Sequence, residues 1–172
     1  MKKSLISITL ILSFVLLITL TSCSTINPLN SVSGDYKGYK RAPYVIWGIK
    51  YYPMTVEQAL NYRASGICSW YDESKLGGLI RGNTAIGEKV MPWDLIAAHK
   101  TLPLPCKVRV TNLSNGKSVV VRVNDRGPFI EGRLFDVSPR VAELLDFKHL
   151  GLTDVNIEVL SVGDGIYKRK AK

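Results

Sequence analysis

Two valine-rich segments constrain the fold of this chain more than any other feature of its sequence. In 107–113 and again in 118–124, valines at every second position alternate with other residues, most of them polar. Alternation with a period of two is typical of β-strands, because successive side chains of a strand point to opposite faces. Asn115-Gly116, between the segments, is the usual sequence of a two-residue type I′ turn. We therefore predict a β-hairpin closed by such a turn.

The other elements are predicted to be short, and most of them are strands. An extended segment over 45–52 precedes a short helix that begins after Thr55, a residue type that caps helix N-termini. Ser138-Pro139 marks a second helix start, followed by an apolar stripe over 141–145. A polar loop is expected over 72–83. Further strands are expected over 67–71, 134–137 and 154–160, and 95–98 is a short apolar run.

The first residues predict export from the cytoplasm. A pair of lysines forms a positive flank, and the apolar stretch over 4–20 is followed by Thr21-Ser22-Cys23. These features describe a signal peptide. A cysteine after two small residues resembles the lipobox of bacterial lipoproteins, so we expect cleavage before Cys23, acylation of its thiol and new amine, and stable membrane anchoring. Ser24, rather than Asp, points to the outer membrane. An ordinary signal peptide or an uncleaved anchor helix is the alternative.

The domain organisation follows from these segments. Because short strands dominate, we predict a mainly β chain with a small closed barrel rather than a sandwich. The predicted parts are a signal peptide over 1–22, a flexible tether over 23–43, a lead-in segment over 44–64, a barrel domain over 65–162 and a basic tail over 163–172. We expect a monomer.

Charge and motif content narrow the partners. Removal of the signal peptide takes away Lys2 and Lys3 and lowers the net charge from +9 to +7. The basic residues are scattered except in the tail, and an exported chain rarely meets nucleic acid. We therefore expect an anionic envelope polymer or lipid surface as the partner, and no nucleic acid. No metal-binding, phosphate-binding or dinucleotide-binding motif occurs, so no metal or other cofactor is expected.

Cys68 and Cys106 remain once Cys23 is acylated. In an oxidising periplasm an even pair of cysteines can form a disulfide. The alternative is two buried free thiols, because free cysteine is among the most buried residue types.

Asp125 is the strongest candidate for acid–base chemistry from the residues themselves. If the preceding strand runs on, its carboxyl points to the same side as Val121 and Val123, and an apolar setting raises the pKa of a carboxyl toward that of a general acid. The alternative is a β-turn over 124–127 in which Arg126 neutralises the carboxylate. Asp136 is expected to be buried, as a structural carboxylate bonded to backbone or to Arg133.

Four other residues are candidates for the site. Glu88 lies in a loop segment, and its alternative is a solvated surface carboxylate. His99 ends the apolar run 95–98, and its alternative is a core or turn histidine bonded to backbone. Trp70 and Tyr71 can form a platform on which sugars stack, because ring faces pack on the apolar faces of pyranoses. Their alternative is the hydrophobic core.

Seven segments in this order resemble the rare lipoprotein A family of septal-ring lytic transglycosylases. The resemblance extends from Tyr44 to Leu160, and the segments around His99 and Asp125 carry it most specifically. The segments are Gly66-Ile-Cys-Ser-Trp-Tyr71, Thr84-Ala-Ile-Gly-Glu88, Ala97-Ala-His-Lys-Thr-Leu-Pro103, Val108-Arg-Val-Thr-Asn-Leu113, Asn115-Gly116, Val121-Arg-Val-Asn-Asp-Arg-Gly-Pro-Phe129 and Arg133-Leu-Phe-Asp136-Val-Ser.

The resemblance implies a six-stranded double-psi β-barrel whose groove binds peptidoglycan glycan strands. It implies cleavage of the MurNAc–GlcNAc β-1,4 bond in strands that lack stem peptides, which leaves a 1,6-anhydro end. The family's catalytic residues fall on Asp125, as the proton donor, and on His99 and Glu88, which position the sugar or tune Asp125. We expect five further residues to bind the substrate: Trp70, Tyr71, Thr84, Arg126 and Asp136.

Two departures from the family pattern keep an alternative open. Ile86 stands where the family usually has Asn, and the 72–83 loop lacks the family's usual His-Gly pair. The alternative is an expansin-like module that grips glycan without cutting it. A structural envelope lipoprotein with no affinity for glycan is a third hypothesis.

Overall fold

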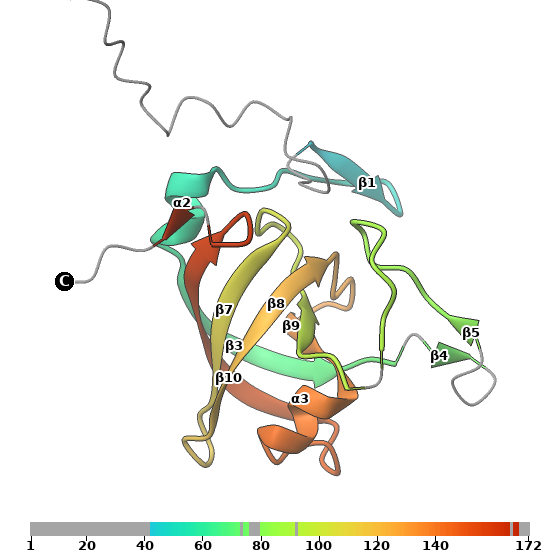
Figure 1. The fold of residues 1–172 in the computed structure, drawn as a ribbon, viewed down its shortest axis with the longest axis vertical. Helices are drawn as coiled ribbons and strands as arrows, with labels where there is room; N and C mark the ends of the chain where they lie inside the picture. The colour runs from blue at the N-terminus through green and yellow to red at the C-terminus, as the bar shows by residue number, and fades with distance from the viewer. Residues whose placement is uncertain (1–41, 73, 76–79, 92, 166, 169–172) are drawn as a thin grey trace, which may run out of the picture. The chain divides into compact units, whose positions relative to one another are not determined.

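Six strands form a closed β-barrel at the centre of the structure, a computed structural model (Figure 1). The strands are β3 (Arg63–Trp70), β6 (Ile96–Ala98), β7 (Cys106–Asn112), β8 (Ser118–Asp125), β9 (Arg133–Val137) and β10 (Leu152–Val162). Their order around the barrel is β10-β3-β9-β6-β8-β7, and the pairing of β10 with β7 closes it. The β3–β9 and β6–β8 pairs are parallel, and the others are antiparallel. The predicted mainly β fold with a closed six-stranded barrel is confirmed.

The structure describes residues 42–72, 74–75, 80–91, 93–165 and 167–168. All of them belong to one compact unit, Val32–Lys172. The predicted signal peptide, the lipid attachment at Cys23 and most of the tether lie outside the described residues. Within the described ranges, no helix is both long enough and apolar enough to span a membrane.

The barrel interior is filled by the valines that the alternation placed on one face. Val108 and Val110 of β7 and Val121 and Val123 of β8 are at most 1 % exposed. Removal of this apolar area from water is the main stabilising term of such a fold. The largest other fully buried side chains are Phe135, Phe147, Leu102, Leu104, Leu145 and Ile157.

The β7–β8 hairpin forms as predicted, but its turn is different. A type I′ turn needs positive φ at both central residues, and only Gly116 has it, at 75°. The connection between β7 and β8 runs over 113–117, which is longer than a two-residue turn, and two asparagine side chains explain its geometry. Asn112 and Asn115 both donate through Nδ2 to the carbonyl of Leu145, at 2.9 and 3.0 Å. This tertiary contact, which local sequence does not reveal, holds the connection in another geometry.

The 45–52 segment is a hairpin rather than a single extended stretch. Strands β1 (Tyr44–Ile46) and β2 (Ile49–Tyr51) pair antiparallel. Between them Trp47 and Gly48 have φ of 48° and 78°, so the two-residue turn with positive φ lies here. The interpretation of 45–52 as one extended segment missed the turn, because tryptophan is an unusual residue at positive φ.

Both predicted helix starts are confirmed. Helix α2 (Val56–Leu60) begins after Thr55, whose hydroxyl accepts from the N–H of Gln58 at 3.2 Å. Helix α3 (Pro139–Leu144) begins after Ser138, whose hydroxyl accepts from the N–H of Val141. Two short pairs complete the structure. Strands β4 (Ser74–Lys75) and β5 (Ile80–Arg81) pair within the predicted 72–83 loop, and β11 (Tyr167–Lys168) pairs with the end of β10.

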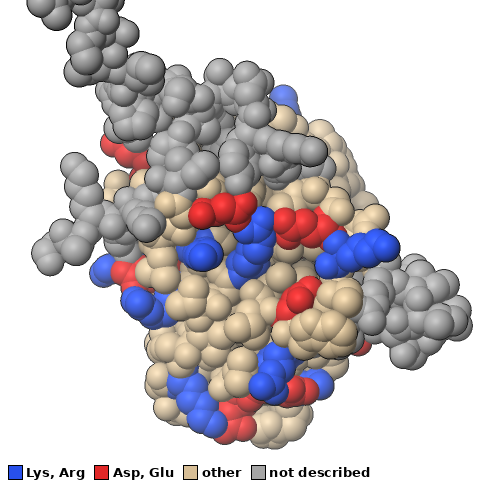
Figure 2. All heavy atoms as spheres, in the orientation of Figure 1, with Lys and Arg blue, Asp and Glu red and all other residues tan. Residues whose placement is uncertain are grey.

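Positive and negative side chains lie next to one another on the face of the molecule shown in Figure 2. Ion pairs occur among the described charged residues. Glu158 lies between Arg63 and Arg109, at 2.5 and 3.0 Å, and Lys117 pairs with Asp146 at 2.7 Å. Exposed pairs of this kind stabilise a fold by about 0–1 kcal/mol each. Each pair neutralises the basic residue that takes part in it.

Candidate active site

Asp125 is the last residue of β8 and lies at an irregularity in the barrel. Ala97 pairs with Val123 and Ala98 pairs with Asp125, so β8 has one extra residue, Asn124, opposite β6. A bulge of this kind interrupts the alternation of side chains and redirects the residues after it. The strand parity suggested that Asp125 shares the buried apolar setting of Val123. Because of the bulge, it does not.

The Asp125 carboxyl is held by one of its two oxygens. Oδ1 accepts from the backbone N–H of Ala85 at 2.8 Å and from that of Arg126 at 2.7 Å. Among the described residues, none donates a hydrogen bond to Oδ2. Because two donors occupy Oδ1, a proton carried by this carboxyl resides on Oδ2.

The turn that supplies the Ala85 donor is closed by Thr84 and Glu88. The N–H of Thr84 donates to the carbonyl of Glu88 at 2.8 Å, and the Thr84 hydroxyl accepts from the N–H of Glu88 at 3.2 Å. Thr84 is 5 % exposed. Its buried side chain therefore stabilises the turn, and the turn orients Asp125 through the N–H of Ala85.

The carboxylate of Glu88 lies against two side chains of β8. Arg122 donates to both of its oxygens, at 2.7 and 3.3 Å, and Asn124 Nδ2 donates at 2.8 Å. The Arg122 hydrogen bond lowers the pKa of Glu88, and the bond from Asn124 and the charge of Arg122 act the same way. Arg122 also pairs with Asp164. Glu88 is thus an ionised, paired group beside the strand that ends in Asp125.

His99 is buried, and both of its ring nitrogens face protein groups. Nδ1 accepts from the backbone N–H groups of Thr101 and Leu102, at 3.1 and 3.0 Å, and Nε2 lies 3.5 Å from the hydroxyl of Tyr62. A nitrogen that accepts two N–H bonds carries no proton, so the proton is on Nε2. Burial, with the charges of Arg126 and Lys100, lowers the pKa of His99 to about 3. The ring is therefore neutral near pH 7.

Arg126 connects the Asp125 strand end to the segment after β6. Its Nη1 donates to the carbonyl of Leu102 at 2.5 Å and lies 3.4 and 3.5 Å from those of His99 and Lys100. Its guanidinium carbon lies 5.2 Å from the centre of the Tyr44 ring, a cation–π arrangement. Arg126 is predicted to bind substrate, and in the structure its side chain is engaged with protein groups.

Asp136 lies on the other side of Ala98 from Asp125. Both aspartates pair with Ala98, from β9 and from β8, so three neighbouring strands present them at the same level. Two strand spacings separate their backbones by roughly 10 Å. Asp136 Oδ1 accepts from Ser69 Oγ, which also accepts from Arg133 at 3.0 Å. Burial raises the pKa of Asp136, against the lowering effects of Ser69, Arg133 and Lys100.

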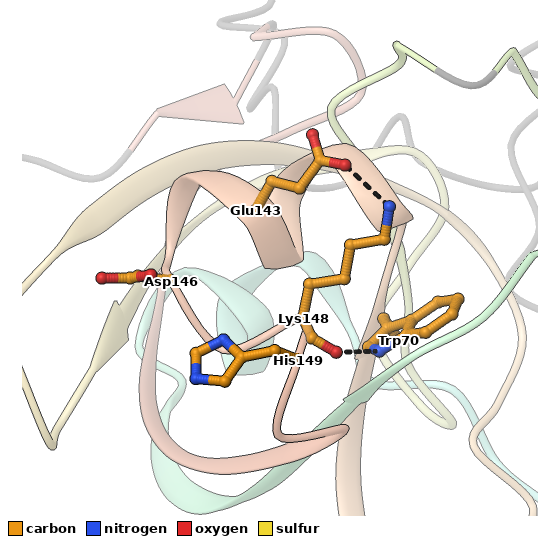
Figure 3. A pocket seen from close by; sticks show the side chains of 5 residues that line it. All are labelled: Trp70, Glu143, Asp146, Lys148 and His149. Carbon is orange, nitrogen blue, oxygen red and sulfur yellow. Dashed lines mark hydrogen bonds and ion pairs between the residues drawn. The ribbon is translucent and has the colours of Figure 1, made fainter.

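Trp70 lies in a different environment. It follows Ser69 on β3, so its side chain points to the opposite face from the Ser69–Asp136 contact. Its indole Nε1 donates to the carbonyl of Lys148 at 3.1 Å, and the Lys148 ammonium lies 5.8 Å from the ring centre (Figure 3). The pocket drawn there is lined by Trp70, Glu143, Asp146, Lys148 and His149. None of these five residues is Asp125, Glu88 or His99, so the structure does not bring Trp70 to them.

Tyr71 and the two barrel cysteines are the remaining predicted residues, and all three are at least partly buried in the fold. Tyr71 is partly buried, and its N–H donates to the carbonyl of Val137 at 3.0 Å. Cys68 and Cys106 are both buried free thiols rather than a disulfide. Burial raises the pKa of Cys68, and it raises that of Cys106 to about 12. Within the described ranges, no group of three or more His, Cys, Asp or Glu residues is placed to hold a metal ion.

Sequence reasoning missed three residues that organise the site. Arg122 and Asn124 fix Glu88, and Ser69 fixes Asp136. Arg122 and Asn124 carried a signal, because they interrupt the apolar residues at the end of a valine strand. Ser69 carried none, since its role depends on the parallel pairing of β3 with β9.

Comparison with known families defines the class of this barrel. A family model described as lytic transglycolase matches residues 63–157, which include all the site residues named above except Tyr44, Tyr62 and Asp164, and confirms the double-psi barrel. The endolytic peptidoglycan transglycosylase RlpA of Rickettsia felis is 40 % identical over 167 residues, with 88 % of this chain and 72 % of that protein covered. The chain belongs to the RlpA family.

Other members are longer than this chain. RlpA of Pseudomonas aeruginosa PAO1 is 49 % identical over 119 residues, which cover 69 % of this chain and 33 % of that protein. RlpA of Campylobacter jejuni is 43 % identical over 121 residues, covering 70 % and 42 %. The chain thus spans less than half of these two relatives.

Among solved structures, similarity is confined to the fold. A Streptomyces papain inhibitor aligns with a TM-score of 0.46 at 18 % identity and covers 58 % of this chain and 96 % of its own. An expansin of Clavibacter michiganensis aligns with a TM-score of 0.45 at 17 % identity and covers 58 % and 50 %.

Proposed function

We propose that this chain is an endolytic peptidoglycan lytic transglycosylase of the cell envelope. The proposed reaction cleaves the MurNAc–GlcNAc β-1,4 bond of glycan strands that carry few stem peptides, and it serves cell separation. The observation that supports it most is the Asp125 carboxyl, which is fixed through Oδ1 while Oδ2 has no donor among the described residues. The names of the RlpA relatives support the same substrate class.

The proposed reaction needs one carboxyl and no water. Asp125 Oδ2 gives its proton to the glycosidic oxygen as the bond between that oxygen and C1 of MurNAc breaks. The carboxylate then takes the proton of the muramyl O6 hydroxyl as O6 bonds to C1. Asp125 regains the proton it lost, and the product has a 1,6-anhydro ring. A single acid–base group therefore completes the cycle.

The other predicted site residues act as positioning residues in this proposal. His99 is neutral and its Nδ1 holds the backbone of the following turn, so it does not exchange protons with the sugar. Glu88 and Thr84 hold the turn that donates to Asp125. Such fixed geometry contributes to rate because the reacting groups start close to the required arrangement.

Asp136 faces the same level of the barrel and is the second carboxyl of the site. Burial raises its pKa, so it holds a proton to higher pH than an exposed aspartate does. We propose that Asp136 binds the substrate. Its carboxyl would form a hydrogen bond with a sugar that lies across Ala98 from Asp125.

The test is the release of 1,6-anhydro ends from amidase-treated peptidoglycan by the purified full-length chain, followed by mass spectrometry. The Asp125→Asn variant keeps an oxygen for the Ala85 and Arg126 donors but has no proton to give. We expect it to lower product release by about 10²- to 10⁴-fold. Asp154→Asn, at an exposed aspartate of β10, is the matched control and keeps full activity. Equal activity of the Asp125→Asn variant and the wild type contradicts the proposal.

A second candidate function is glycan binding without cleavage. Two observations favour it. Glu88 is paired with Arg122, and both ring nitrogens of His99 face protein groups, so neither side chain is available to take part in proton transfer to a substrate. The same assay separates the two. Co-sedimentation with amidase-treated sacculi without any anhydro product supports glycan binding alone. If the chain neither co-sediments nor releases anhydro product, both candidate functions are contradicted.

We also propose that Cys23 carries a lipid anchor that holds the chain at the outer membrane. The support is the sequence before it, with a positive flank, an apolar core and two small residues. Metabolic labelling with an alkyne-bearing palmitate analogue should mark the wild-type chain and leave the Cys23→Ser variant unmarked. Label on both proteins contradicts this assignment.

A further inference from the structure

An exposed aromatic hairpin stands beside the strand end that carries Asp125. In the β1–β2 turn the side chain of Trp47 is 81 % exposed, and its backbone has a φ of 48°. Non-glycine residues rarely adopt positive φ, and bulky ones least of all. Neither burial nor backbone preference accounts for a tryptophan at this position.

The hairpin is tied to the loop that follows Asp125 by stacked rings. The Tyr44 and Tyr51 rings stack with centres 5.2 Å apart, and both lie against Phe129, at 6.4 and 5.6 Å. The Tyr44 hydroxyl donates to the carbonyl of Lys100 at 2.5 Å. Phe129 is four residues after Asp125. The hairpin therefore has a fixed position relative to the carboxyl.

Trp47 extends this ring cluster outward to solvent. Its ring centre lies 6.1 Å from that of Phe129, in an edge-on arrangement. Next to β2, Tyr52 is 64 % exposed. The hairpin thus presents aromatic surface to solvent on the outer side of a rigid cluster. Rings of this kind bind with little loss of conformational freedom, because a tryptophan has only two side-chain torsions.

We propose that Trp47, supported by Phe129, forms a sugar-stacking subsite for the glycan strand on the hairpin side of Asp125. The proposal rests on the proposed function, since a strand cut at an internal bond continues past that bond on both sides. The ring cluster connects this surface directly to the loop that follows Asp125. The apolar C–H face of a pyranose matches an indole face, and the amphipathic rings suit a partly wet surface.

The test measures strand binding separately from cleavage, in the full-length chain carrying Asp125→Asn. Binding of amidase-treated glycan strands is compared with and without Trp47→Ala, and we expect the alanine variant to bind about tenfold more weakly. Trp47→Tyr should recover most of the affinity, because it restores an aromatic face. Leu113→Ala is the matched control, since Leu113 is 54 % exposed and lies beyond the end of β7 distant from Asp125.

The outcomes separate this inference from the proposed function. Unchanged strand binding in the Trp47→Ala variant, with an unchanged circular dichroism spectrum, overturns the subsite even if the wild type releases anhydro products. Weakened binding supports the subsite even if the wild type releases none. If Trp47→Ala instead weakens binding to anionic phospholipid vesicles and leaves strand binding intact, the hairpin is a membrane contact and the subsite is overturned.

Discussion

The backbone N–H of Ala85 donates to Oδ1 of Asp125 at 2.8 Å, so a turn forty residues earlier in the chain orients the carboxyl. The turn is closed in part by the buried hydroxyl of Thr84, which accepts from the N–H of Glu88. The orientation of the proposed proton donor thus depends on a residue that does not itself contact Asp125 through its side chain.

The Thr84→Val variant should lose activity without unfolding. Valine keeps the shape of threonine but removes the acceptor for Glu88 N–H, a hydrogen bond that contributes about 1 kcal/mol to stability. We expect kcat to fall about tenfold, because the Ala85 donor is no longer fixed and Asp125 is held less firmly. Thr84→Ser keeps the hydroxyl and should retain most of kcat. Equal kcat for the valine and serine variants, measured by anhydro-product release, contradicts this role.

Buried His99 should make the folded chain less stable as pH falls. In the unfolded chain the histidine binds a proton near pH 6.5, whereas the pKa of His99 in the fold is about 3. Protons therefore favour the unfolded state between these values. Stability is full above pH 6.5 and declines below it, by about 2 kcal/mol between pH 7 and pH 5 from this group.

Urea unfolding at the two pH values measures this effect. His99→Asn keeps an acceptor near the position of Nδ1 but does not titrate, so its stability should depend less on pH than that of the wild type. His149→Asn, at the exposed second histidine, should behave as the wild type does. If the His99→Asn variant and the wild type show the same pH dependence, the assignment of His99 as a buried neutral group is wrong.

Glu88 should titrate at higher pH when its partner is removed. The hydrogen bond from Arg122 is the largest cause of the lowered pKa of Glu88. In the Arg122→Met variant that pKa should rise toward the ordinary value, as followed by NMR of the labelled carboxyl. Arg109→Met, which removes a partner of Glu158 instead, should leave it unchanged. A Glu88 titration that does not respond to Arg122→Met contradicts the ion pair.

The two barrel cysteines should be unreactive in the folded protein. Both are fully buried, and burial raises both thiol pKa values, which suppresses the reactive thiolate. In a Cys23→Ser chain, a chromogenic disulfide reagent should label no thiol under native conditions and two in denaturant. Labelling of none in denaturant, before any reductant is added, would mean that Cys68 and Cys106 form a disulfide after all.

Local patterns in the sequence were sufficient for several elements of the fold. The alternation of valines predicted β7 and β8, because the side-chain period of a strand is the same wherever the strand lies. Thr55 and Ser138 predicted the starts of α2 and α3, since a cap needs only the next turn of backbone. The residues around His99 and Asp125 identified the family for the same reason, as a contiguous pattern.

The site itself was decided by contacts between segments far apart in the chain. The extra residue Asn124 in β8 changed the setting of Asp125, and only the pairing with β6 creates that bulge. Burial and backbone donors made His99 neutral, and Arg122 fixed Glu88. By itself the sequence determined the β7–β8 hairpin and the two helix starts, because these depend on neighbouring residues. Which oxygen of Asp125 remains available was decided only by tertiary structure, because its partners come from a separate turn.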